Sequence, residues 1–196
     1  MNRTLGVLIS GRGSNLKAII DAIKDGRLDA SIAVVISNRA DAQGLDHAIA
    51  AGLDTLVLSH KSYATREDYD RALVAELKNR RVALVCLAGF MRLLSPAFVD
   101  AFPNRILNIH PSLLPKYPGL HPQQQALDDG ATESGATVHF VNKDLDAGPI
   151  VLQQSVAVLR GDTAETLAAR ILEVEHRLYP AAIGRVLNGA GAAGST

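Results

Sequence analysis

Short apolar segments alternate with amphipathic helical patterns along this chain, and this alternation limits its possible folds more than any other feature. Residues 5–9 form an apolar run that ends in a glycine turn, and from Ser14 apolar residues recur at helical spacing. Further apolar or β-branched runs, separated by helical patterns, cover residues 32–36, 55–58, 82–87 and 106–109. The pattern predicts an α/β fold with a mainly parallel, twisted sheet and helices on both of its faces.

The last third of the chain departs from this alternation. Residues 137–141 and 150–159 read as strands joined by a short turn, so we expect an antiparallel pair at the C-terminal side of the sheet. Asp162 with Glu165 predicts the start of a long final helix, as Thr65 does for an earlier one. The core face of the final helix is predicted from Leu167, Ile171, Val174 and Leu178.

Length and composition exclude several classes of protein. The 196 residues fit one domain, which we expect over residues 1–188, with residues 189–196 as a disordered tail of small residues. Lys plus Arg equals Asp plus Glu at 20 each, so no net field favours nucleic acid or an anionic membrane as a partner. Cys86 stands alone in an apolar run, and no Cys/His cluster predicts a metal site. Without a signal peptide or a membrane-spanning run, we expect a cytoplasmic protein.

The stretch from Ile106 to Pro118 carries the first candidate site. Asn108 and His110 are two residues apart on a predicted strand, so they point the same way at its end. Prolines then commit the chain to a loop. A histidine can act as a general acid or base, and an asparagine amide can donate to a developing oxyanion. The alternative is a structural histidine bonded to backbone, with Asn108 capping the turn.

A glycine loop after the first strand, Ser10 to Asn15, forms the second candidate site. Gly11 and Gly13 let backbone approach a ligand, and Ser14 and Asn15 add donors at a helix N-terminus, which suits phosphate. A dinucleotide fingerprint lacks its third glycine here, and no Walker lysine is present. The loop therefore favours a phosphate monoester over NAD or ATP. The alternative is a glycine turn that only permits tight helix packing.

Two carboxylates complete the candidates. Asp146 lies in a predicted tight turn and approaches His110 if the two strands are neighbours, where it would favour the charged imidazole. Glu175 flanks the core face of the final helix and is a candidate to face a ligand. The alternatives are an ordinary turn residue and a solvated glutamate at a helix edge.

Four segments resemble the phosphoribosylglycinamide formyltransferases, a family of folate-dependent enzymes. They are Ser-Gly-Arg-Gly-Ser-Asn-Leu (10–16), Leu-Ala-Gly-Phe-Met-Arg (87–92), Asn-Ile-His-Pro-Ser-Leu-Leu-Pro (108–115), and Val-His-Phe-Val with Leu-Asp-Ala-Gly-Pro (138–149). The resemblance extends in order over nearly the whole chain. It implies a single-domain Rossmann-like fold and transfer of a formyl group from 10-formyltetrahydrofolate to glycinamide ribonucleotide in purine synthesis, without a metal, by a monomer or homodimer.

The resemblance also implies a role for each matching position. Asn108, His110 and Asp146 would be catalytic. The ribonucleotide would be held by Gly13, Ser14, Asn15, Leu172, Glu173, Val174 and Glu175. The folate would contact Arg66, Met91, Arg92, Leu93, Leu94, Asn108, Asn142, Lys143, Asp144, Leu145 and Asp146. Pro122, Gln123 and Leu172 depart from the more polar residues expected at their positions.

Three other functions remain open from the sequence. A formyltetrahydrofolate hydrolase would use the same Asn108, His110 and Asp146 to deliver water, and such relatives carry an extra N-terminal domain. A methionyl-tRNA formyltransferase would need an RNA-binding domain or a basic face. A catalytically silent protein that binds a phosphate ligand is the alternative outside enzymes.

Overall fold

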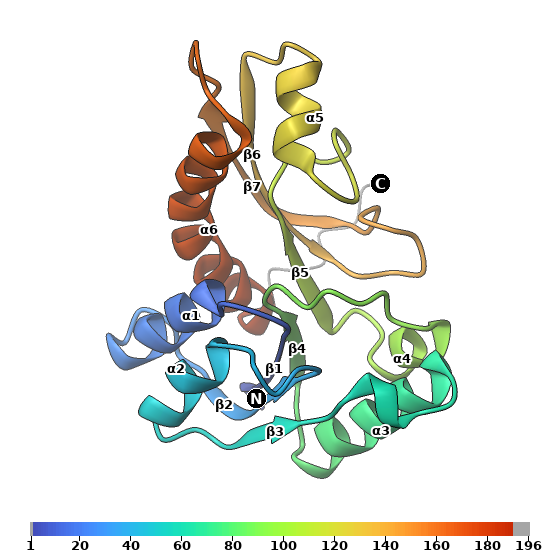
Figure 1. The fold of residues 1–196 in the computed structure, drawn as a ribbon. Helices are drawn as coiled ribbons and strands as arrows, with labels where there is room; N and C mark the ends of the chain where they lie inside the picture. Colours follow the sequence, from blue (N-terminus) through green and yellow to red (C-terminus); the bar gives the residue numbers. More distant parts are fainter. Residues whose placement is uncertain (1, 190–196) are drawn as a thin grey trace. The chain divides into compact units, whose positions relative to one another are not determined.

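The computed structural model describes residues 2–189 (Figure 1). These residues divide into two compact units with the boundary after Leu107. The predicted disordered tail lies outside the described residues, except for Gly189. Each unit is described by itself below.

The first unit is built on a parallel sheet. Its strands are β1 (Thr4–Ile9), β2 (Ser31–Ser37), β3 (Thr55–Val57) and β4 (Leu84–Leu87), in the order β3-β2-β1-β4. All three strand pairs are parallel. The strand order reverses between β1 and β4, and ligands of open α/β sheets collect outside the carboxyl ends of the strands at such a point.

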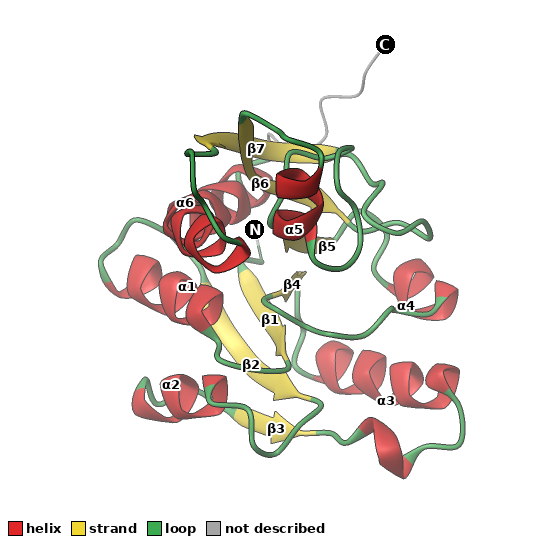
Figure 2. Cartoon of the chain, turned by 45° about the horizontal axis from the view of Figure 1, so that its top comes forward, coloured by secondary structure: helices red, strands yellow, loops and turns green. Residues whose placement is uncertain are grey.

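Helices cover both faces of this sheet. They are α1 (Ser14–Lys24), α2 (Gly44–Ala50), α3 (Arg66–Asn79) and α4 (Pro96–Ala101), with a 3₁₀ turn, η1, at His60–Ser62. Figure 2 shows α1 and α2 on one face, and α3 and α4 on the other. Because both faces are covered, β1 and β4 are almost wholly buried, which explains their continuous apolar sequence. Cys86 is one of these core residues.

The second unit holds the antiparallel pair. Strand β5 (Ile106–His110) carries Asn108 and His110 into it, and β5 lies beside β6 (Glu133–Phe140), which pairs antiparallel with β7 (Ile150–Ala157). Helices α5 (Pro122–Asp128) and α6 (Ala164–Leu187) contact each other and β6. Strand β6 starts four residues earlier than predicted. Residues 134–140 are all buried, so the alternation of apolar and polar residues that was used to predict the strand does not correspond to an exposed face. The predicted α/β class, mainly parallel with an antiparallel C-terminal pair, is confirmed.

The predicted start of the final helix was wrong in its capping residue. Thr163, and not Asp162, caps α6 in a reciprocal pair with Thr166. The carboxylate of Asp162 accepts two hydrogen bonds from Arg170, at 2.7 and 2.9 Å, one from the amide of Leu159 and one from the hydroxyl of Thr166. At α3, Thr65 is the N-cap as predicted.

Candidate active site

The end of β5 brings Asn108 beside two imidazoles and a carboxylate. Its side-chain Nδ2 lies 3.4 Å from Nε2 of His139 on β6. Oδ2 of Asp146 lies 3.4 Å from Nδ1 of His110, and Oδ1 lies 3.7 Å from Nε2 of His139. The side chains of both histidines and of Asp146 are less than 10 % exposed. The three predicted catalytic residues therefore form one cluster inside the second unit, together with His139.

The turn between β6 and β7 positions Asp146. Gly148 is pressed against the carbonyl of Phe140, where a Cβ atom would come within 1.7 Å of the oxygen. The turn is closed by the Phe140 amide, which donates to Pro149. Asp146 itself has φ +49°, and its Oδ2 accepts a hydrogen bond of 2.9 Å from the amide of Gly119. A backbone held in this uncommon conformation keeps the carboxylate pointed at the histidines.

His110 has both ring nitrogens engaged. Nε2 lies 2.9 Å from the carbonyl oxygen of Tyr117, which only accepts hydrogen bonds, so Nε2 carries the proton. Nδ1 faces the Asp146 carboxylate at 3.4 Å, and a carboxylate oxygen likewise accepts hydrogen bonds. Both ring nitrogens of His110 therefore face hydrogen-bond acceptors.

The loop after β5 is anchored before it reaches Tyr117. Thr137 on β6 donates to the carbonyl of Ser112 at 2.7 Å and accepts from the amide of Leu114 at 3.1 Å. Gln153 on β7 donates to the carbonyl of Leu114 at 2.9 Å. Tyr117 is tied by its hydroxyl to Asp129, 2.6 Å away, just after α5. These contacts hold the Tyr117 carbonyl over His110.

His139 is the site residue that the sequence reasoning missed. Burial is the main cause that lowers the pKa of His139, so the ring is neutral at pH 7. Its Nδ1 donates to the carbonyl of Phe140, 3.0 Å away, which leaves Nε2 as an acceptor for the Asn108 amide. The ring thus fixes the orientation of the Asn108 side chain. Its position near the end of a strand, just before the turn that holds Asp146, was the available signal.

The glycine loop lies in the first unit, at the reversal point of its sheet. Gly13 precedes α1 with φ +72°, and no side chain caps the helix, and the N-terminus of a helix is a place where anions bind. Gly13 also packs against Gly44, where a Cβ atom on Gly13 would lie 2.4 Å from the Gly44 Cα. Tight helix packing, which was the alternative interpretation of this loop, is therefore present as well as an open helix N-terminus.

Polar groups link the carboxyl ends of three strands beside this loop. Ser10, after β1, donates to Asn38 at 2.6 Å and accepts from the amide of Met91, after β4, at 2.9 Å. Asn38 in turn lies 3.5 Å from Nδ1 of His60. A side chain predicted to bind folate, Arg92, stacks over the ring of Tyr69 at 5.5 Å.

The other predicted binding residues are divided between the units. In the first unit, Met91 and Leu93 are 75 % and 60 % exposed, and Arg66 opens α3 with an ion pair to Glu67. In the second unit, the turn residues Lys143, Asp144 and Leu145 are exposed, and Asn142 is half-buried.

The four predicted residues of α6 differ in exposure. Val174 and Glu175 are buried, Leu172 is half-buried and Glu173 is exposed. Glu175 is therefore a buried carboxylate and not a solvated residue at the helix edge. The ribonucleotide site expected from both units stays a prediction.

No group of three or more His, Cys, Asp and Glu side chains among residues 2–189 is arranged to hold a metal ion. None of the helices described is both long and apolar enough to cross a membrane.

Comparison with known proteins defines the family. Residues 3–183 match the formyl transferase family model, and the chain belongs to this family. It is 50 % identical over 183 residues to phosphoribosylglycinamide formyltransferase of Escherichia coli, covering 93 % of this chain and 86 % of that protein. It is 51 % identical to the trifunctional purine biosynthetic protein adenosine-3 of Drosophila pseudoobscura pseudoobscura, covering 96 % of this chain but spanning only 14 % of that longer protein.

Solved structures agree with this assignment. Glycinamide ribonucleotide transformylase 1 from Symbiobacterium toebii superposes with a TM-score of 0.94 at 53 % identity, covering 96 % of this chain and 89 % of that one. Phosphoribosylglycinamide formyltransferase from Brucella melitensis superposes with a TM-score of 0.91 at 47 % identity, with both chains fully covered.

Proposed function

We propose that this protein transfers the formyl group of 10-formyltetrahydrofolate to the amine of glycinamide ribonucleotide, in purine biosynthesis. Support comes from relatives named phosphoribosylglycinamide formyltransferase, which are 50 % and 46 % identical to this chain over most of its length. The observation that carries the proposal is the buried Asp146 carboxylate, 3.4 Å from His110 and 3.7 Å from His139, next to the Asn108 amide. Such a cluster can stabilise an oxyanion and move a proton, which are the two needs of formyl transfer.

The reaction begins when the glycinamide amine attacks the formyl carbon. The carbonyl oxygen becomes negative in the tetrahedral intermediate, and the amide of Asn108 donates to it. Because His139 accepts one proton of the Asn108 NH₂ group, the other remains for the oxyanion. One lost donor of this kind costs about 3–4 kcal/mol of barrier.

His110 supplies the positive charge near the oxyanion. Its Nε2 proton is held by the Tyr117 carbonyl, 2.9 Å away, so donation to substrate requires that this bond be exchanged for one to the formyl oxygen. A shift of the loop that carries Tyr117 is enough to release the proton. The Asp146 carboxylate, 3.4 Å from Nδ1, is the counter-charge of the ring during the exchange.

Asp146 also transfers the proton that must leave the attacking amine. The amine nitrogen is positive after attack, and its proton passes through the Asp146 carboxylate, by way of a bound water, to N10 of the folate. The C–N bond to N10 then breaks, and the products are formylated ribonucleotide and tetrahydrofolate. No covalent intermediate with the protein is needed.

Binding follows the division of residues already described. Gly13, Ser14 and Asn15 hold the ribonucleotide phosphate with the open amides of α1. Residues 172–175 contact its ribose and glycinamide, with the Glu175 carboxylate as the polar group. The folate lies against residues 91–94 and 142–146, where the exposed side chains of Met91 and Leu93 offer apolar contact.

The first experiment measures release of tetrahydrofolate from 10-formyltetrahydrofolate, with and without glycinamide ribonucleotide. Release that requires the ribonucleotide and yields its formylated product supports the proposal. Release at the same rate without the ribonucleotide would identify a hydrolase. Binding of both ligands without any release would identify a silent binding protein, and either of these results refutes the transferase.

A further inference from the structure

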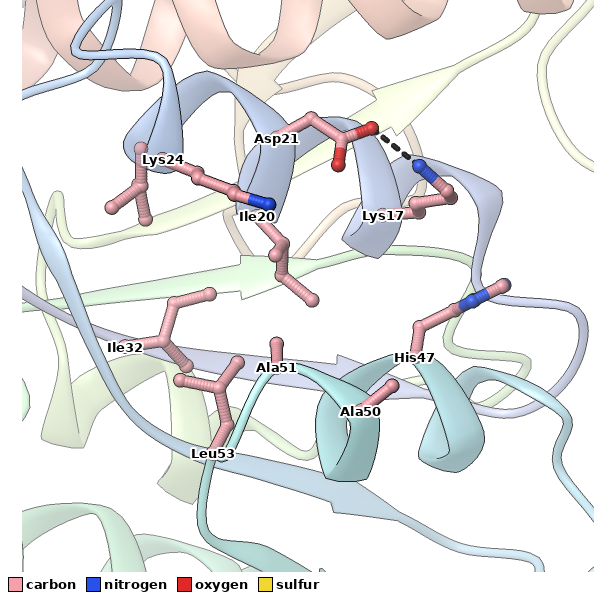
Figure 3. A pocket seen from close by; sticks show the side chains of 10 residues that line it. Lys17, Ile20, Asp21, Lys24, Ile32, His47, Ala50, Ala51 and Leu53 are labelled. Carbon is pink, nitrogen blue, oxygen red and sulfur yellow. Dashed lines mark hydrogen bonds and ion pairs between the residues drawn. The ribbon is translucent and has the colours of Figure 1, made fainter.

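A cavity of about 490 Å³ lies between α1 and α2, apart from the residues discussed so far. Figure 3 shows side chains of both helices lining it, with Ile20 of α1 above Ala51 and Leu53, which follow α2. Its volume falls within the range of about 300–1,000 Å³ that small-molecule sites occupy. The apolar lining residues are Ile20, Ile23, Ile32, Ala50, Ala51 and Leu53.

The packing of α1 against α2 explains why side chains do not fill this space. Gly13 and Gly44 bring the N-terminal ends of α1 and α2 into backbone contact, with Gly44 also donating to the Gly11 carbonyl at 2.9 Å. Helix α2 is only seven residues long, and it ends in Ala50, which is followed by Ala51. These small side chains do not reach the isoleucines of α1, so a groove remains where larger residues would fill the interface.

The position of the groove separates it from the proposed phosphate site. Ile32 is the second residue of β2, so the floor of the groove is near the amino end of that strand. Ser14 and Asn15 instead follow the carboxyl end of β1. The groove therefore cannot be a part of the phosphate loop, although both are built on α1.

The charges around the groove are mainly positive. Two lysines, Lys17 and Lys24, line it together with one acid, Asp21, and with the imidazole of His47. Lys17 is paired with Asp21 at 2.6 Å, whereas residues 2–189 offer Lys24 and His47 no side-chain hydrogen bond or ion pair. An apolar space with an unpaired ammonium at its edge suits a ligand with an apolar body and one anionic group.

We propose that the groove between α1 and α2 is a binding site for a small amphipathic anion, whose apolar rings lie on Ile20 and Ile32 and whose anionic group meets Lys24. The ligand class is a carboxylate, sulfonate or phosphate attached to an aromatic or alicyclic body. The site does not depend on the proposed activity.

The test uses 8-anilino-1-naphthalenesulfonate as the probe and N-phenyl-1-naphthylamine as the same molecule without its anionic group. Protein with ¹³C-labelled isoleucine methyl groups is titrated with each probe, and methyl shifts are followed by NMR. We expect the sulfonate to shift Ile20, Ile23 and Ile32 in a saturable way, and the neutral probe to bind more weakly. Isoleucines of the other unit, such as Ile171 and Ile183, report binding elsewhere.

Variants separate the charge from the apolar lining. Lys24→Gln should weaken sulfonate binding about three- to fivefold, as expected for a partly solvated ion pair. Lys78→Gln is the matched control, because Lys78 is also the basic residue in the last turn of a helix, α3, and should change nothing. Ala51→Phe, at an exposed position, should fill the groove and abolish the isoleucine shifts without lowering the melting temperature.

Two results would overturn the proposal. If the methyl signals of Ile20, Ile23 and Ile32 do not move at high concentrations of the sulfonate, the groove is not a binding site. Equal affinity for both probes, or equal effects of Lys24→Gln and Lys78→Gln, would show that the ligand class is wrong.

Discussion

Replacing Asp146 by Asn should abolish most turnover while leaving the fold and substrate binding nearly unchanged. The substitution is isosteric, and the asparagine oxygen can still accept the hydrogen bond from Gly119 that Oδ2 accepts at 2.9 Å. What is lost is the negative charge 3.4 Å from Nδ1 of His110. The imidazolium then has no counter-charge, and no carboxylate is present to carry the amine proton.

The magnitude follows from the geometry. Opposite charges at about 4 Å attract by about 4 kcal/mol at an effective dielectric constant of about 20. Each 1.36 kcal/mol changes a rate about tenfold, and part of the attraction is offset by the cost of removing the charges from water. We therefore expect kcat to fall by about 10²–10³-fold, and KM for both substrates to change less than about threefold.

The assay follows tetrahydrofolate release at saturating ribonucleotide, with the melting temperature of each variant measured alongside. Glu133→Gln is the control, because Glu133 is an exposed carboxylate at the start of β6 and lies outside the proposed site. A kcat for Asp146→Asn within about fivefold of the parent protein would refute the role assigned to Asp146. A large rise in KM with normal kcat would assign it to binding instead.

Three further predictions concern stability. Gly13→Ala should cost about 1–3 kcal/mol more than Gly26→Ala, measured by urea unfolding, because both glycines have φ near +72° but only at Gly13 would the new Cβ collide with backbone. Tyr69→Phe should leave the melting temperature unchanged or raise it, because the buried Tyr69 hydroxyl has no hydrogen-bond partner among residues 2–189. Asp162→Asn should make the stability of the protein fall less steeply as the pH decreases below about 4. The Arg170 guanidinium lowers the pKa of Asp162 in the folded protein, so this carboxylate stabilises the fold above its unfolded pKa and that contribution disappears as the pH falls.

Each of these predictions has a contrary outcome. Equal losses for the two glycine variants would mean that α1 and α2 separate without cost. A clear drop in melting temperature for Tyr69→Phe would reveal a hidden partner of the hydroxyl. Parallel melting curves against pH for Asp162→Asn and the parent protein would show that the ion pair with Arg170 adds nothing to stability.

The sequence by itself determined the order and type of the secondary structure. Strands with both faces covered are continuously apolar, and amphipathic helices show apolar residues at helical spacing. For this reason β1, β4 and α6 can be predicted from the sequence alone. The prediction that Asn108 and His110 point the same way at a strand end also came from a local rule, the alternation of side chains along a strand. Their approach to Asp146 was expected only if the two strands were neighbours.

Only the tertiary structure decided what surrounds these residues. His139 contacts Asn108 because β5 and β6 are neighbours, and no local pattern states which strands lie side by side. The N-cap of α6 is Thr163, while the carboxylate of Asp162 pairs with Arg170, eight residues away. The groove between α1 and α2 likewise exists because Gly13 meets Gly44 across 31 positions of sequence. Contacts distant in sequence depend on how whole elements pack, and this packing has no signature in the neighbouring residues.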